Sequence, residues 1–64
     1  MIIIKIKDKD NTHTHNVESS IDELELRLTN CFEKKLFIII KTENQSTIYH
    51  SEYLQNCIIE LSTI

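Results

Sequence analysis

The stretch SSIDELELRLTNCFEKKLFIIIK, residues 19–41, joins the pattern of a capped amphipathic helix to that of an apolar β-strand. Ser20 and Glu23 have the spacing of a capping box, in which each side chain bonds the backbone N–H of the other residue, so a helix should begin after Ser20. The apolar residues that follow recur at helical spacing and form one stripe: Ile21, Leu24, Leu28, Cys31 and Phe32. The stretch therefore predicts a helix with one face packed against a sheet.

The segment Leu24, Leu26 and Leu28 also alternates as a strand would. The cap, the acidic first turn, the lysines at the far end and the longer stripe favour the helix. In a helix, Leu26 lies about 200° around the axis from Leu24, so its side chain should point away from the core. Leu26 is therefore a candidate interface residue.

Residues 36–40 are apolar at every position and rich in β-branched side chains, which is typical of a strand covered on both faces. One helix can cover only one of those faces. A chain of 64 residues is also short, and such a chain buries only about 60% of the surface it exposes when unfolded. We therefore expect residues 36–40 to form a central strand and the protein to be a homodimer or larger.

Four further strands are expected from alternation between turn segments rich in Asp, Asn and Thr. The complete set of expected strands is 2–8, 12–17, 36–40, 46–51 and 57–64. Residues 12–17 should be an edge strand, and residues 52–56 a short or single-turn connection. The predicted fold is a single small α+β domain of order ββαβββ, with one helix on an antiparallel or mixed sheet. A βαβββ order without the second strand is the alternative.

Composition excludes several classes of function. The net charge of −3 argues against tracking a nucleic-acid backbone, and the longest apolar runs are far too short to span a membrane. The start of the chain lacks the pattern of a signal peptide, so a cytoplasmic protein is expected, with Cys31 and Cys57 as buried thiols. Without glycine the chain has neither a P-loop nor a dinucleotide fingerprint, and no cofactor is expected.

Histidine and cysteine provide the only candidates for site chemistry. His13 and His15 are two apart on an expected strand, so they face the same side and could offer two imidazoles to one metal, but two ligands do not make a site. Cys57 with His50 as a base is the conceivable nucleophilic pair. Because a domain of this size offers little concavity, we expect no enzyme.

Tyrosines and lysines indicate surfaces. Tyr49 and Tyr53 are candidate interface residues, since tyrosine is enriched where proteins bind each other. Lys5, Lys7 and Lys9 alternate along the first strand, where they are expected to guard a sheet edge against aggregation.

The layout of a short strand, a polar turn and a capped helix is followed by Phe37-Ile38-Ile39-Ile40, by Ile48-Tyr49 and by Asn56-Cys57-Ile58-Ile59-Glu60. This layout resembles small, mostly uncharacterised α+β proteins of low-GC Gram-positive bacteria and their phages. The twelve isoleucines and the absence of glycine, proline, tryptophan and alanine fit the same low-GC origin. The resemblance implies no catalytic or binding residue.

These observations favour a non-catalytic protein-binding module, in particular a phage or mobile-element accessory protein that binds and inhibits a host protein. Two alternatives belong to other classes. A histidine-based metal-binding or metal-sensing module would be stabilised by stoichiometric zinc. A dimeric nucleic-acid-binding regulator would lose affinity steeply with added salt.

Overall fold

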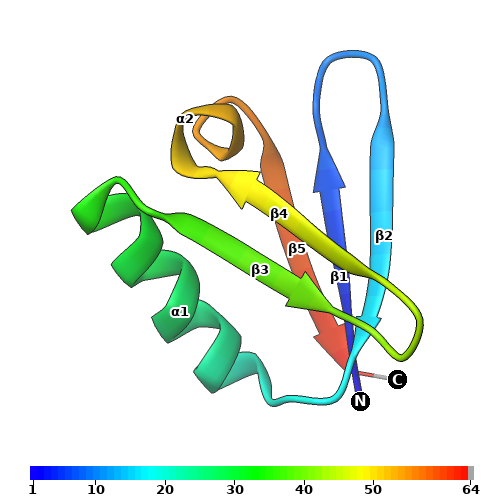
Figure 1. The fold of residues 1–64 in the computed structure, drawn as a ribbon. Coiled ribbons are helices and arrows are strands. Elements are labelled where there is room, and N and C mark those ends of the chain that lie inside the picture. Colours follow the sequence, from blue (N-terminus) through cyan, green and yellow to red (C-terminus); the bar gives the residue numbers. More distant parts are fainter. Residues whose placement is uncertain (64) are drawn as a thin grey trace.

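The computed structural model describes residues 1–63, which form five strands and two helices. In chain order the elements are β1 (Ile2–Lys7), β2 (Thr12–Val17), α1 (Ile21–Lys34), β3 (Phe37–Lys41), β4 (Ser46–His50), α2 (Ser51–Leu54) and β5 (Ile58–Thr63) (Figure 1). The α+β class and the order ββαβββ are confirmed. The expected short connection contains the single-turn helix α2. Ile64, expected at the end of the last strand, lies outside the described residues.

The five strands form two antiparallel sheets. One has three strands in the order β2-β1-β5, and the other is a two-stranded ribbon of β3 and β4. The expectation that residues 36–40 form a central strand is therefore wrong, since within residues 1–63 β3 pairs only with β4 and the central strand is β1. An apolar run shows that both faces of a strand are apolar, but it does not show that both are covered.

β1 has a partner on each side, so its lysines do not guard an edge. Lys5 lies opposite Glu60 of β5, and Lys7 donates a hydrogen bond to the Glu60 carboxylate at 2.6 Å. Both lysines lie on the face opposite to the buried Ile4 and Ile6. Their role is thus to make the outer face of the three-stranded sheet polar. The edge expected at β2 is confirmed.

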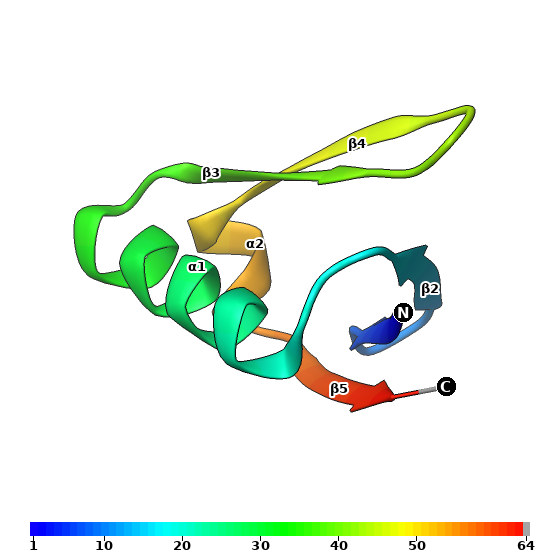
Figure 2. The same cartoon turned by 90° about the horizontal axis from the view of Figure 1, so that it is seen from below.

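A single core lies between the two sheets. Figure 2 shows the ribbon on one side of the molecule and the three-stranded sheet on the other, with α1 and α2 between them at one end. The periodicity of each element decides which of its side chains point into the core. In the strands these are every second side chain, and in α1 they form one stripe. The fully buried large apolar side chains are Ile2, Ile4, Ile6, Leu24, Ile40 and Leu54.

The predicted cap of α1 is confirmed. The Ser20 hydroxyl accepts a hydrogen bond from the Glu23 N–H at 3.2 Å, which satisfies one of the free donors at the start of the helix. The helix is capped at its C-terminal end by Lys35, which has a φ of 54° in the left-handed region. This position usually holds glycine, and the chain has none. The Leu36 N–H then bonds the Cys31 carbonyl at 3.0 Å and turns the chain into β3.

The turn between β1 and β2 also forms without glycine. One oxygen of the Asp8 carboxylate accepts hydrogen bonds from the N–H groups of Asp10 and Asn11, at 2.8 and 2.6 Å. This is the side-chain turn chemistry that the Asp and Asn residues predict. Asp8 itself belongs to the turn, so β1 is one residue shorter than expected.

Candidate interaction surfaces

The outer face of the ribbon is apolar. Alternation along β3 places Ile38 and Ile40 in the core and turns Phe37 and Ile39 outward, and Ile48 lies opposite Ile39 on β4. We call Phe37, Ile39 and Ile48 the ribbon face; their exposed fractions are 63%, 48% and 62%. Single exposed apolar residues are ordinary, but three large ones on one small sheet indicate an interaction surface.

Two cations lie beside the ribbon face. Arg27 of α1 reaches the free side of β3, where its Nη2 donates a hydrogen bond to the Ile39 carbonyl at 2.8 Å. Lys41 lies at the end of β3 on the outward side and is exposed. The His50 ring packs edge-on against Phe37, with ring centres 4.8 Å apart. A partner for this face would therefore combine an apolar centre with acidic groups at its rim.

The two tyrosines differ in how deeply they are buried. Tyr49 is 8% exposed and belongs to the core, so the expectation of an exposed aromatic is wrong there. Its position on the inner face of β4 follows from the alternation that turns the neighbouring Ile48 outward. Tyr53 of α2 lies at the margin and is 36% exposed.

His15 connects the two sheets. Its Nε2 lies 2.6 Å from the hydroxyl oxygen of Tyr49, a hydrogen bond between β2 and β4. The His15 ring also packs edge-on against the Tyr49 ring at 5.7 Å, and the His13 ring lies 6.3 Å from it. The two histidines share a face as expected, but that face is the inner one, where His13 is exposed and His15 is half-buried.

Burial affects the charge state of this cluster. Loss of water around the imidazole lowers the pKa of His15, and the neighbouring His13 lowers it further. Burial likewise raises the pKa of Tyr49. The neutral form of His15 is therefore the one that the fold favours.

The described residues place no third metal ligand beside His13 and His15. Across residues 1–63, no group of three or more His, Cys, Asp or Glu side chains is placed to hold a metal ion. In addition, the Nε2 of His15 is already bonded to Tyr49. The histidine-based metal module stays a prediction, which titration with zinc tests.

Tyr53 ties α2 to the first turn. Its hydroxyl donates a hydrogen bond to Asp8 Oδ2 at 2.6 Å, and its ring stacks on that of Tyr49 with ring centres 6.0 Å apart. This bond lowers the pKa of Asp8, as do the two backbone N–H groups that bond the same carboxylate. The same bond raises the pKa of Tyr53. Tyr53 is thus engaged within the fold, although one side of it stays accessible.

Both cysteines are free thiols. Cys31 is buried, burial raises the pKa of its thiol, and its Sγ lies 3.1 Å from the Leu36 carbonyl. Cys57 is only half-buried, contrary to expectation. The Nδ1 of His50 accepts a hydrogen bond from the Glu52 N–H, and the Cys57 thiol donates to the Tyr53 carbonyl. No hydrogen bond within residues 1–63 joins Cys57 to His50, the conceivable pair of nucleophile and base.

Leu26 is exposed on α1 and points away from the core, as predicted. It lies on the side of the helix opposite to the buried Leu24 and Leu28. Its exposure leaves it accessible to a partner.

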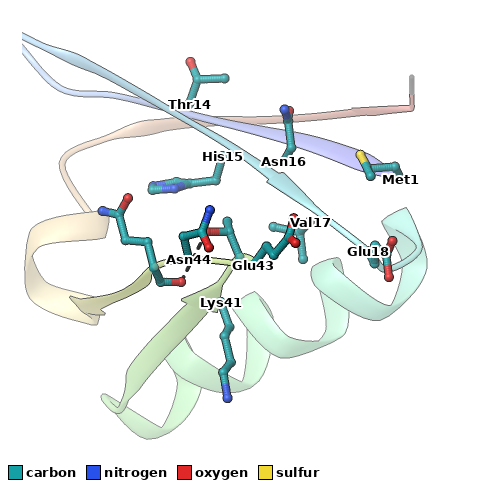
Figure 3. A pocket seen from close by; sticks show the side chains of 11 residues that line it. Met1, Thr14, His15, Asn16, Val17, Glu18, Lys41, Glu43 and Asn44 are labelled. Carbon is teal, nitrogen blue, oxygen red and sulfur yellow. Dashed lines mark hydrogen bonds between the residues drawn. The ribbon is translucent and has the colours of Figure 1, made fainter.

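Sequence reasoning missed two depressions of the surface. An open cleft of about 1030 Å³ separates the edge of β2 from the turn between β3 and β4 (Figure 3). It is lined by Met1, by residues 14–18 and by residues 41–45. A smaller groove of about 370 Å³ lies between α1 and β5. Neither could be read from the sequence, because each depends on where the ribbon and α1 lie over the sheet.

Comparison with known proteins gives no match: no family model fits the chain, and no curated protein or solved structure is significantly similar to it. Neither helix in the described part of the chain is long and apolar enough to cross a membrane.

Proposed function

We propose that this chain is a non-catalytic protein-binding module whose primary contact is the ribbon face. The observation that carries the proposal is the exposure of Phe37, Ile39 and Ile48 together on one side of a two-stranded ribbon. Large apolar side chains gathered at one exposed place are typical of protein-binding surfaces.

Charge indicates the kind of partner. Arg27 and Lys41 lie beside the ribbon face, so acidic residues around an apolar centre would complement it. The same cations disfavour a symmetric dimer through this face, because a two-fold axis sets identical patches against each other. The homodimer expected from the sequence stays a prediction, which light scattering at micromolar concentration tests.

The resemblance to small phage proteins favours a host protein as the partner. Binding would then inhibit that protein or hold it in place. The cytoplasm is the compartment in which we expect this contact.

The chain offers a matched pair of positions for testing the ribbon face. Ile48 and Lys5 are exposed strand residues on the outer faces of the two different sheets, and Lys5 lies on the central strand β1. A photoreactive amino acid at Ile48 should cross-link a discrete protein in a low-GC Gram-positive host, whereas the same group at Lys5 should not. Equal cross-linking from both positions, or cross-linking from Lys5 alone, would contradict the proposal.

A further inference from the structure

β5 is an edge strand, and the hydrogen-bond pattern fixes which of its backbone groups are free. The Asp8 N–H donates to the Asn11 carbonyl at 2.9 Å, so the backbone of Asp8 faces β2. Because this direction alternates along an antiparallel strand, Lys7 and Lys5 turn their backbone groups toward β5. The residues of β5 whose N–H and C=O groups point to the open side are therefore Ile59, Leu61 and Thr63.

This open edge borders the groove beneath α1. The groove has a volume of about 370 Å³, and its lining residues are Glu25, Leu28, Thr29, Phe32, Ile59 and Leu61. Ile59, Leu61 and Phe32 are only partly buried where they pack against the core. A further strand beside β5 would bond the free backbone groups and cover these side chains at the same time.

The groove carries a single charge. Glu25 is the only charged residue in its lining, and no ion pair within residues 1–63 involves it, since the one ion pair there joins Lys7 and Glu60. A ligand strand that brings a cation to Glu25 would complement it. The groove is therefore complementary to a ligand strand that carries apolar side chains and one basic side chain on the same face.

We propose that the groove between α1 and β5 binds an extended segment of a partner protein, which adds antiparallel to β5 and presents two apolar residues and one Lys or Arg to α1. This site is separate from the ribbon face. The occupant is not a second copy of β5, because the copy would present Ile59, Leu61 and Thr63 to the helix, without a cation. Symmetric pairing would also bring in a second α1 with its own Glu25.

The test uses a peptide of defined sequence with the folded chain. In acetyl-Thr-Lys-Thr-Val-Thr-Val-Thr-amide, one face carries Lys, Val and Val and the other carries threonines. Hydrogen exchange followed by NMR should show slower exchange of the Ile59, Leu61 and Thr63 amides when the peptide is added. The amides of Thr14 and Asn16, on the other free edge, should exchange as before.

A charge exchange tests the role of Glu25. Glu25→Lys should weaken binding of the lysine peptide about tenfold, and a peptide with Glu in place of Lys should bind this variant better than the unmodified protein. Glu33→Lys is the matched control, because Glu33 lies on the same helix outside the groove lining. Ile48→Lys should leave peptide affinity unchanged, which separates this site from the ribbon face.

Three results would overturn the proposal. The first is that the peptide binds with unchanged affinity after N-methylation of those of its backbone N–H groups that should pair with β5. Another is slowed exchange at Thr14 and Asn16 in place of the β5 amides. The third is protection of Ile59, Leu61 and Thr63 that needs no peptide and grows with protein concentration, which would assign the edge to a second copy.

Discussion

The two sheets each bury one face, and they differ in what the other face exposes. The outer face of the three-stranded sheet carries Lys5, the Lys7–Glu60 ion pair and Thr14 of β2. The outer face of the ribbon carries the apolar Phe37, Ile39 and Ile48. An antiparallel sheet with one solvated face normally makes that face polar. The first sheet largely follows this rule, with Ile58 as the one large exposed apolar side chain on its outer face among the described residues. The ribbon departs from this rule at the surface to which we assign binding.

The largest expected effect separates the two faces of β3. Ile38 is 4% exposed and Ile39 is 48% exposed, and they are neighbours in the same strand. Ile38→Ala should lower the free energy of unfolding by about 3 kcal/mol, because it removes buried methyl groups and leaves a cavity. Ile39→Ala should lower it by less than about 1 kcal/mol. Urea denaturation measures both values on the same scale.

If Ile39→Ala lowered the free energy of unfolding as much as Ile38→Ala, the expected difference between the two faces of β3 would be contradicted. It would mean that the ribbon face is already covered in solution. Repeating the measurement over a hundredfold range of protein concentration would then identify a second copy as the cover, since dissociation adds a concentration dependence to unfolding.

The sequence predicts the elements well and their assembly poorly. The Ser20 cap, the Asp8 turn and the alternation in residues 2–7 are local, and all three are as expected, although the Glu23 carboxylate accepts from the Ser19 hydroxyl where the capping box predicts the Ser20 N–H. The division into two sheets depends on which strands pair, and the apolar run of β3 is compatible both with a strand covered on two faces and with an exposed ribbon. The ribbon face and the groove beside β5 depend on the same pairing of strands that are distant in the sequence. Leu26 was correctly placed outside, because the apolar stripe of a helix identifies its buried side. Tyr49 was wrongly expected outside, because a short strand of mixed residues does not show which of its faces is buried.

The next effect concerns the link between the two sheets. Tyr49→Phe removes the hydroxyl that lies 2.6 Å from His15 Nε2 and should cost about 1 kcal/mol of unfolding free energy. Tyr53→Phe is the matched control, since its bond to Asp8 is exposed and should contribute less. A larger loss in the control would place the main link between the sheets at α2.

The same link predicts a dependence on pH. Because burial lowers the pKa of His15 in the folded state, the unfolded chain takes up a proton first as the pH falls. Stability should therefore be complete above the ordinary histidine value of 6.5 and decrease as the pH falls from there through the lowered folded-state pKa. His15→Gln should reduce this decrease between pH 7 and pH 5, and His13→Gln should reduce it less. Thermal unfolding across this range gives the comparison.

The smallest expected effect is at Leu26, which tests whether the ribbon face or the outer side of α1 is the interaction surface. Leu26→Glu should change the free energy of unfolding by less than about 1 kcal/mol, because Leu26 is exposed and glutamate is nearly as good a helix former as leucine. The new local cost is repulsion from Asp22 and Glu23, four and three residues earlier, which is worth a few tenths of a kcal/mol for each pair. If light scattering detects a dimer, Leu26→Glu should leave its mass unchanged, because we assign no contact to the outer side of α1. A dimer that dissociates in this variant, while Ile48→Glu leaves it intact, would move the interface to the helix, because a charge is tolerated in water and not inside a packed apolar contact.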